Sequence, residues 1–297
     1  MSAEIEGYQS PKKAPTATSS GLLGRVRELY EYRYLLQNLV VRDLKVRYKN
    51  SFLGIVWSLL NPLLMMVVFS LVFSRFGGTE IRQYAVFFLV GLMPWNFFSG
   101  ALLTGTTSIT NSSGIIKKVY FPRELLPLSA ILSNLVNFGF TLIVLLVFLY
   151  GSGLGLTVHA LWIPVIIVTQ IIFTLGLAMF LGAINVFYRD VLMILDVVML
   201  AWFFLTPIMY PFELFNDMSP IIIGELVLEP ARVMRWINPM ASIIDGYRTV
   251  LWGTMTSDGP VSMYPPYLLR TFVTSVIVFV VGYVTFMRLH SKFGEKL

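Results

Sequence analysis

Five charged side chains crowd into the segment Arg42–Lys49, and four of them are basic. Arginine and lysine donate charge-assisted hydrogen bonds, so this basic segment could hold an anionic group such as a phosphate. Tyr48 adds a hydroxyl to the same short stretch. No further charge occurs until Arg75, so the basic segment directly precedes an apolar run. The pattern predicts an anion-binding segment at the edge of a membrane.

Residues for covalent or metal catalysis are scarce. Cysteine is absent and the only histidines are His159 and His290, which excludes a thiol nucleophile and a His/Cys metal cluster. A G-x-x-x-x-G-K-[ST] phosphate loop is also absent; the run Gly151–Leu156 is rich in glycine but lacks the lysine. We therefore expect no catalytic site, no metal and no cofactor on this chain.

The composition is that of a membrane protein. Hydrophobic residues make up 56% of the chain and charged residues only 13%, well below the roughly 25% charged residues of soluble domains. Six apolar stretches are long enough to cross a bilayer core about 30 Å thick. They are Phe52–Ser74, Tyr84–Gly105, Leu125–Tyr150, Leu161–Phe187, Val191–Tyr210 and Tyr267–Met287. The sequence predicts an all-α integral membrane protein with six transmembrane helices.

Six spans put both termini on one side of the membrane. Sixteen of the 22 lysines and arginines then lie on the side of the termini, which predicts that both termini are cytoplasmic. The net charge of +6 follows from this topology and requires no nucleic-acid partner. A signal peptide is a poor alternative for the first span because about fifty residues precede it.

Two segments precede the first span. Residues 1–21 are rich in proline, serine and threonine, which predicts a disordered leader. In residues 22–50 apolar side chains recur every three or four residues, which predicts an amphipathic helix on the cytoplasmic membrane surface. Those apolar side chains are Leu29, Tyr32, Leu36, Val40, Leu44 and Tyr48. The alternative is that the basic residues of this helix only set the topology.

Two connections between spans carry more than loop residues. Segment 112–127 combines basic and aromatic side chains ahead of two prolines, which is typical of an anchor for another protein. Segment 211–252 is longer than most loops and contains apolar runs too short to cross the bilayer. We expect this second segment to form external re-entrant helices between spans five and six.

Two sets of residues inside the spans have open interpretations. Asp196 is the only carboxylate there, and a charge at the bilayer centre costs about 2.5 to 3.5 kcal/mol, which favours a functional role. Its position close to the cytoplasmic end favours a structural role instead. Aromatic side chains in and beside the first, second and fifth spans could line a path through the membrane, or could simply face lipid. These path-lining candidates are Trp57, Trp95, Phe97, Trp202, Phe203, Phe204 and Tyr210.

Five motifs together resemble the permease subunit of ATP-binding-cassette exporters of cell-surface polysaccharides, the O-antigen and teichoic-acid export family. They read LVVRDLKVRYKNSFLGIVWSLLNPLL, IIKKVYFPRELLPLSAIL, NVFYRDV, WFFLTPIMY and INPMASIIDGYRTVLW. The similarity runs from about Tyr34 to the C-terminus, and the first two motifs are specific in order and spacing. The leader has no counterpart in this resemblance.

The resemblance implies a role for each motif. It makes residues 22–50 a gate helix at the cytoplasmic entrance, with Arg42, Asp43, Lys45, Arg47, Tyr48 and Lys49 at the substrate entrance. It makes segment 112–127 the contact with a separate ATPase, through Lys117, Lys118, Tyr120, Phe121, Pro122, Arg123 and Glu124. Two permeases and two ATPases would form the complex in a bacterial plasma membrane, with ATP and magnesium bound by the ATPase. The cargo would be a lipid-linked polysaccharide or a teichoic-acid-like polymer, and membrane lipids would surround the subunit.

Two alternatives stay open at this point. One is an exporter of the same architecture that carries a small lipid or a drug. The other, from a different class, is a membrane-embedded enzyme that processes glycans. A transporter would hydrolyse ATP only with its partner, whereas an enzyme would lose turnover when one carboxylate is removed.

Overall fold

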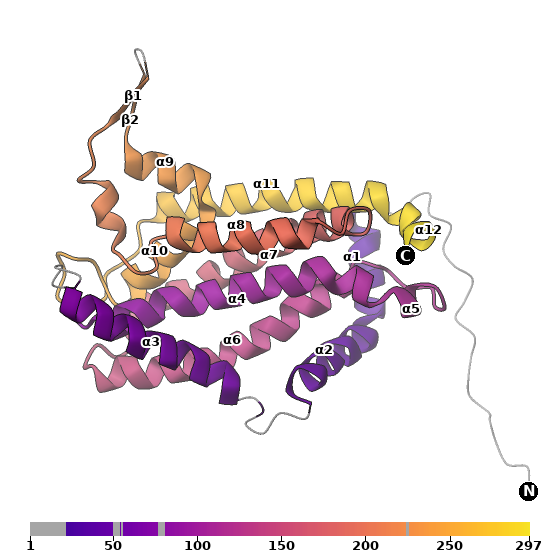
Figure 1. Ribbon diagram of the computed structural model, residues 1–297, viewed down its shortest axis with the longest axis horizontal. Helices are drawn as coiled ribbons and strands as arrows, with labels where there is room; N and C mark the ends of the chain where they lie inside the picture. Colours follow the sequence, from indigo (N-terminus) through magenta and orange to yellow (C-terminus); the bar gives the residue numbers. More distant parts are fainter. Residues whose placement is uncertain (1–21, 50–53, 55, 77–80, 224–225) are drawn as a thin grey trace, which may run out of the picture.

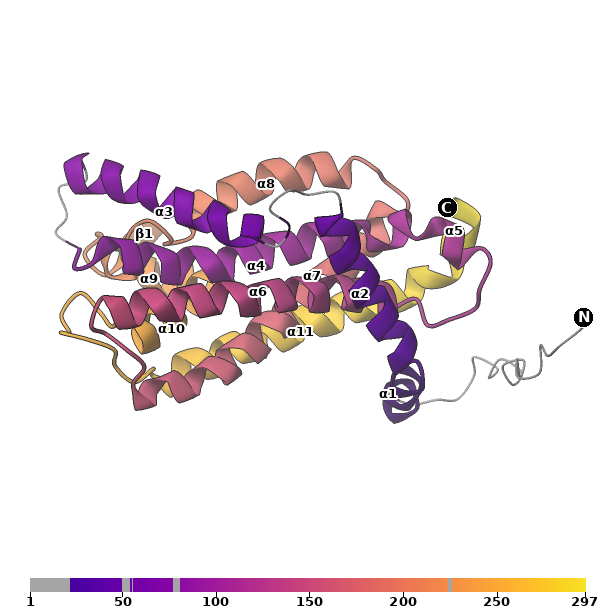
Figure 2. The ribbon, with the colours of Figure 1, turned by 90° about the horizontal axis from the view of Figure 1, so that it is seen from below.

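The computed structural model describes residues 22–49, 54, 56–76, 81–223 and 226–297, so the expected leader lies outside the described residues. Four long helices run side by side through the molecule: α4 (Tyr84–Asn111), α6 (Leu125–Gly151), α7 (Ile163–Asn185) and α11 (Pro265–Leu289). Two further apolar helices flank them, α3 (Val56–Phe76) and α8 (Val191–Leu205) (Figures 1 and 2). The described fold is a helical bundle, as the apolar stretches predict.

The two ends of the bundle are built differently. At one end, which we call the α5 end, lie α1 (Leu22–Glu31), α5 (Ser113–Ile116), the turn η3 (His290–Lys292) and α12 (Phe293–Lys296). At the other, the hairpin end, lie the turn η2 (Phe212–Phe215), the strands β1 (Ile221–Ile223) and β2 (Leu226–Leu228), and the helices α9 (Pro230–Ile237) and α10 (Pro239–Leu251). The expected cytoplasmic segments therefore gather at the α5 end.

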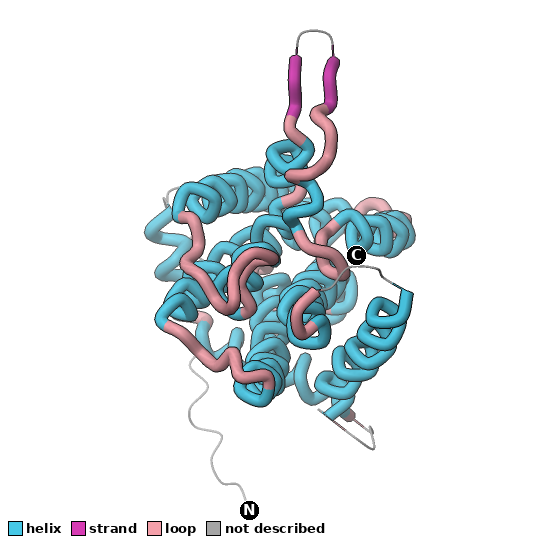
Figure 3. Tube along the Cα trace, turned by 90° about the vertical axis from the view of Figure 1, so that its left-hand side faces the viewer, coloured by secondary structure: helices cyan, strands magenta, loops and turns pink. Residues whose placement is uncertain are grey.

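The antiparallel hairpin departs from the expected all-α fold. Ile221 pairs with Leu228 and Ile223 with Leu226, and Figure 3 shows the hairpin projecting away from the bundle. Runs of isoleucine, leucine and valine favour extended structure, and these runs are too short for a stable helix. The apolar runs of segment 211–252 therefore form a hairpin as well as two short helices.

Four of the six expected spans have helices of membrane-crossing length and composition. These stretches are Tyr84–Asn111, Leu125–Gly151, Val158–Asn185, which includes the turn η1 (Val158–Trp162), and Pro265–Lys296. The other two expected spans coincide with shorter apolar helical stretches, Leu59–Phe73 and Val191–Leu205. By length and composition, the described residues thus hold four candidate spans, and the six-span topology stays a prediction.

The fifth expected span is shorter than the sequence suggests because of a proline. α8 ends at Leu205, and Thr206 is extended, with φ −90° and ψ 134°. A proline disfavours helical geometry in the residue before it, so Pro207 ends the helix five residues before the expected limit at Tyr210. The carbonyl groups that follow then need hydrogen-bond donors from elsewhere.

Arg248 of α10 supplies those donors. Its side chain is 4% exposed and donates hydrogen bonds to the carbonyl oxygens of Pro207, Ile208 and Tyr210, the last at 3.0 Å. Its guanidinium also lies 3.7 Å from the ring centroid of Phe87. α10 is almost entirely buried and contacts α4, α7 and α11, so Arg248 ties the non-helical end of α8 to the core.

Glycines set the closest helix crossing, that of α7 and α11. A side chain at Gly176 would overlap the backbone of Phe279, and one at Gly282 would overlap the backbone of Gly176. Small residues allow such close approach of helices in membranes. Around this pair, α4 is the central helix and contacts α3, α6, α7 and α10.

The expected gate helix is divided in two. α1 ends at Glu31 and α2 (Arg33–Tyr48) begins after Tyr32, which has φ −89° and ψ 16°. Leu39 is the buried residue of α2 and packs near Phe121 and Leu125. Figure 2 shows α2 crossing the bundle near the α5 end at a steep angle to α4 and α6.

Candidate functional site

A polar groove lies between α2, α4 and α6 at the α5 end. It has a volume of about 500 Å³. It is lined by Arg42, Asp43, Val46, Arg47, Thr104, Thr107, Ser108, Asn111, Ser112, Leu126, Ala130 and Ser133. Three of the six residues expected at the substrate entrance, Arg42, Asp43 and Arg47, therefore meet a wall rich in hydroxyl groups.

The basic segment is fixed to the bundle by two asparagine amides, and one of its arginines is paired within the segment. Arg42 Nη2 lies 2.8 Å from the carboxylate of Asp43. Arg47 Nη2 donates a hydrogen bond to Asn134 Oδ1 at 2.9 Å, and the Tyr48 hydroxyl bonds Asn137 Oδ1 at 2.5 Å. Both asparagines lie on α6, so this helix holds the C-terminal half of α2.

Asn134 and Asn137 were missed by the reasoning from sequence. The available signal was their spacing: two asparagines three residues apart in an apolar span share one helix face. Asn134 Nδ2 also donates to Thr104 Oγ1 of α4 at 2.8 Å. Among the described residues, Asn137 Nδ2 is buried without a hydrogen-bond partner. Polar side chains inside membrane spans commonly join helices or serve a transport path.

The groove has an excess of positive charge. Two arginines line it against one aspartate. Asp43 neutralises Arg42, whereas Arg47 is bound by a neutral amide and keeps its full charge. A guanidinium beside hydroxyl groups can bind phosphate or carboxylate oxygens. Lys45 and Lys49 are exposed and do not line the groove. Tyr48, the last residue of α2, also lies outside the lining and bonds Asn137 of α6.

The expected ATPase-contact segment has an outer and an inner face. Lys117 and Lys118 are exposed, together with Val119 at 57% and Tyr120 at 68%. Large apolar side chains that are this exposed in a connection between helices are typical of an interaction site. The outer face could therefore dock on an acidic partner surface.

The remaining residues of this segment face inward and contact other parts of the same chain. Phe121 is 6% exposed and Pro122 is also buried. Arg123 donates to the carbonyl oxygen of His290 and lies 5.9 Å from the Phe293 ring centroid. Glu124 is 6% exposed and its carboxylate lies 3.4 Å from Arg25 of α1. Arg123 and Glu124 thus tie the segment to η3, α12 and α1.

The candidate path-lining aromatics divide between core and surface. Trp95 and Phe97 are buried in the core of the protomer, at 5% and 4% exposure. Trp202 and Phe203 are partly buried and pack edge-on against Trp95. Three others lie further out: Trp57 and Phe204 are exposed, and the hydroxyl of partly buried Tyr210 donates to the Phe204 carbonyl oxygen at 3.0 Å. Asp196 is exposed on α8.

Comparison with known proteins identifies relatives that are named as export permeases. The O-antigen export system permease protein RfbA of Myxococcus xanthus is 39% identical over 228 residues, 76% of this chain and 84% of the relative. Two proteins of the same name from Klebsiella pneumoniae are 33% and 32% identical, over 92% and 90% of this chain and 99% and 98% of the relatives. The resemblance inferred from the five motifs is thereby confirmed, and these relatives are named as permeases, which are transport components rather than enzymes.

The family assignment rests on most of the chain. Residues 34–252 match the family described as ABC-2 type transporter. The matched stretch includes the basic segment, the groove and all but the last long helix. The chain is therefore a multi-pass membrane protein that belongs to the ABC-2 type transporter family.

Proposed function

We propose that this chain is the membrane-spanning permease subunit of an ATP-driven exporter of a cell-surface polysaccharide. The observation that carries the proposal is the similarity to O-antigen export permeases over up to 92% of the chain. The cargo is a lipid-linked glycan of the O-antigen class, with a teichoic-acid-like polymer as the alternative cargo. Export runs from the cytoplasm to the outer face of a bacterial plasma membrane.

The groove at the α5 end is the proposed entrance. Arg47 captures the anionic phosphate that joins lipid to glycan, because its charge is not neutralised by its bond to Asn134. Hydroxyl groups of Thr107 and Ser108 line the opposite wall and offer oxygen acceptors to sugar hydroxyls. Lys45 and Lys49 attract anionic headgroups to the same end from outside the groove.

The partner is an ATP-binding-cassette ATPase, as expected for a permease of this family. Two copies of each chain form the complex, and the ATPase binds ATP and magnesium. The ATPase docks on the exposed face of segment 112–127, around Tyr120 with Lys117 and Lys118. In this arrangement the α5 end and both termini face the cytoplasm.

The translocation path forms where two copies of the chain meet. Trp57 and Phe204 are exposed on the protomer and are the strongest candidates to line it. Flat aromatic faces stack on the C–H surfaces of sugars without demanding a particular sugar. Trp95 and Phe97 support the path from the core instead of touching the cargo.

Deletion and complementation test this function. Loss of the gene should stop surface display of the polysaccharide and leave lipid-linked glycan inside the cell, and the wild-type chain should restore display only with its ATPase. Normal polysaccharide on the surface of the deletion strain would contradict the proposal. Loss of a small lipid from the outer leaflet, with the polysaccharide unaffected, would support the exporter of small lipids instead.

A further inference from the structure

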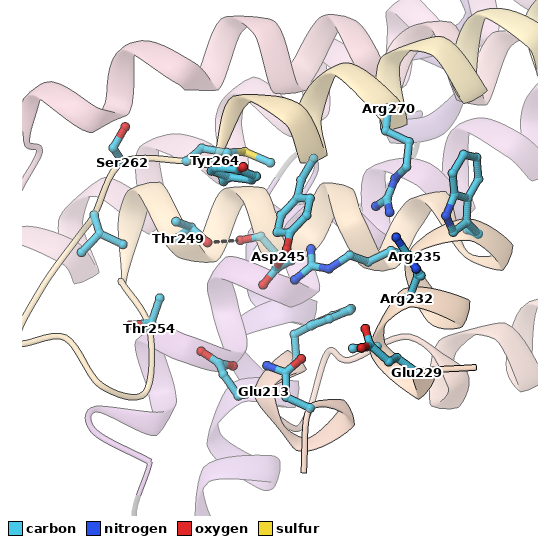
Figure 4. Close-up of a pocket in the computed structure, with 17 residues that line it drawn as sticks. Glu213, Glu229, Arg232, Arg235, Asp245, Thr249, Thr254, Ser262, Tyr264 and Arg270 are labelled. Carbon is cyan, nitrogen blue, oxygen red and sulfur yellow. Dashed lines mark hydrogen bonds and ion pairs between the residues drawn. The ribbon is translucent and has the colours of Figure 1, made fainter. Parts of the chain in front are cut away.

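A second pocket opens at the hairpin end, far from the entrance groove. It has a volume of about 730 Å³, within the range of ligand sites. Residues from η2, α9, α10 and the start of α11 line it, and Figure 4 shows their side chains converging. Four elements that are separate in the sequence thus form one cavity.

Aromatic side chains form part of its wall. Trp236 is 58% exposed and Tyr264 is 59% exposed, so more than half of each side chain stays accessible. Tyr267 packs edge-on against Tyr264, with ring centroids 4.9 Å apart. Exposed rings at a cavity rim are suited to stacking on the apolar face of a polar ring.

Charged side chains also line the pocket, and two of the arginines are held by their neighbours. Arg235 Nη1 lies 2.7 Å from Asp245 Oδ2, and its guanidinium stacks between Phe212 and Tyr267, at 3.9 and 4.3 Å from their ring centroids. Arg270 lies 5.3 Å from the Trp236 ring centroid and donates to Ser242 Oγ at 3.3 Å. This arrangement fixes donors beside the aromatic faces.

Arg270 also has unused hydrogen-bonding capacity. Among the described residues its Nε is buried without a partner. Figure 4 shows Arg270 pointing from α11 toward Arg232 and Arg235, with Glu229 beside Arg232 and Glu213 further along the pocket. An oxygen-rich ligand in the pocket would give the guanidinium groups that line it hydrogen-bond acceptors.

The charge balance identifies the kind of ligand. Three arginines line the pocket against two glutamates and one aspartate, so its formal charge is close to zero. Sugar hydroxyls both donate and accept, so they can bond carboxylates and guanidinium groups at once. A polyanion would be repelled by Glu213 and Glu229, and an acyl chain would leave the polar wall unsatisfied.

We propose that this pocket is a saccharide-binding subsite on the exit side of the subunit. It rests on the proposed function and adds to it a place where sugar units of the polymer are held after crossing. Trp236 and Tyr264 stack on the sugar rings, while Arg232, Arg270 and Glu229 bind hydroxyl groups. The subsite binds neutral sugar units and not the anionic lipid anchor, because the positive and negative charges of its wall balance.

Binding of a defined probe tests the proposal. The probe is a fluorescent oligosaccharide released by mild acid from the surface polysaccharide of the host, added to the permease–ATPase complex in phosphatidylcholine nanodiscs. Trp236→Ala should raise its Kd about tenfold, and Glu229→Gln by a smaller factor. Tyr150→Ala is the matched control, because Tyr150 is a 63% exposed aromatic at the same end but outside the pocket.

The outcomes separate this proposal from the proposed function. Wild-type complex that does not bind the probe, or a Kd that Trp236→Ala leaves unchanged, overturns the subsite even if cells export the polysaccharide normally. Loss of bound phosphatidylglycerol in Trp236→Ala, with probe binding unchanged, would identify a lipid headgroup site and would also overturn it. Normal surface display of the polysaccharide in the deletion strain would instead contradict the proposed function.

Crosslinking provides a test that does not depend on truncating the pocket. The chain lacks cysteine, so Ser262→Cys places one thiol in the pocket wall and Ser152→Cys places one at the same end outside it. A maleimide-diazirine on Ser262→Cys should yield a glycan adduct during active export, and the Ser152→Cys control should yield none. Equal adducts at both positions, or none at Ser262→Cys while export proceeds, would overturn the subsite.

Discussion

The two ends of the bundle use arginine in opposite ways. At the α5 end, Arg47 is held by the neutral amide of Asn134, so its charge is available to an anion. At the hairpin end, Arg235 is held by the carboxylate of Asp245 and by two aromatic rings, so its charge is compensated. The partner of an arginine, more than its presence, therefore decides whether a cavity attracts anions or binds neutral polar groups.

The two cavities also differ in how they are assembled. The groove combines one contiguous basic segment with the facing ends of α4 and α6. The pocket combines η2, α9, α10 and the first turns of α11, and Arg248 helps to hold this group by anchoring α10 to the residues that follow α8. A change in the core is therefore expected to disturb the pocket more than the groove.

The largest expected effect concerns which end faces the cytoplasm. Single cysteines at Asn111 and Ser291, both exposed at the α5 end, should react with an impermeant maleimide only after the cells are opened. Cysteines at Ser152 and Ser219 should react on intact cells. Asn111 is suited to labelling because it is exposed, whereas its neighbour Ser112 is only 4% exposed. Labelling of Asn111→Cys on intact cells would reverse the assignment of the two ends.

The second prediction separates docking from folding within segment 112–127. Phe121→Ala should lower the stability of the permease by about 3 kcal/mol, because the ring is buried in the protomer. Tyr120→Ala should leave stability unchanged and weaken ATPase binding about thirtyfold, since truncating an interface anchor costs about 2 kcal/mol. Thermal unfolding in detergent and copurification of the ATPase measure the two effects. Full ATPase recovery with Tyr120→Ala would place the docking site elsewhere.

The third prediction tests the compensated pair at the hairpin end. Arg235→Gln should lower stability by about 2 kcal/mol, since it leaves the carboxylate of Asp245 partly buried and unpaired. Adding Asp245→Asn to the Arg235→Gln variant should restore part of the lost stability. A double-mutant cycle of melting temperatures measures the coupling. Additive effects of the two substitutions would show that the ion pair contributes nothing to stability.

The stability of the Arg235→Gln variant should also depend on pH. Burial raises the pKa of Asp245 above its ordinary value, and Arg235 opposes that rise. Without Arg235 the folded-state pKa exceeds the unfolded value further, so stability falls as the pH rises through the folded pKa. The stability deficit of Arg235→Gln should therefore shrink as the pH is lowered and the Asp245 carboxyl takes up its proton. A deficit that grows on acidification would contradict this account.

The smallest expected effect distinguishes two neighbouring cations at the α5 end. Arg47→Gln should raise the substrate concentration for half-maximal ATP hydrolysis about fivefold, because a basic residue near an anionic group contributes about 1 kcal/mol. Lys49→Gln should change it less than about twofold, because Lys49 is exposed and outside the groove. Equal effects of the two substitutions would mean that only the total charge matters.

Much of the fold could be predicted from the apolar runs. The long helices α4, α6, α7 and α11 begin or end within a few residues of the expected spans, because length and hydropathy set a membrane helix with little help from its neighbours. The early end of α8 was accessible from Pro207 but was missed, and the hairpin was missed because short apolar runs do not separate strand from helix. The chemistry of the entrance was partly predictable, since the basic segment is contiguous.

The sequence by itself determined the membrane class, the positions of the long helices, the basic segment and the family. Each of these is a property of a contiguous stretch. The tertiary structure alone decided which charges stay available. It placed Arg47 on Asn134, turned Phe121 and Glu124 inward, and closed a pocket from residues as far apart as Phe212 and Arg270. Such pairings depend on how helices cross, and the crossings are set by close packing at sites such as Gly176 and Gly282, which no local pattern encodes.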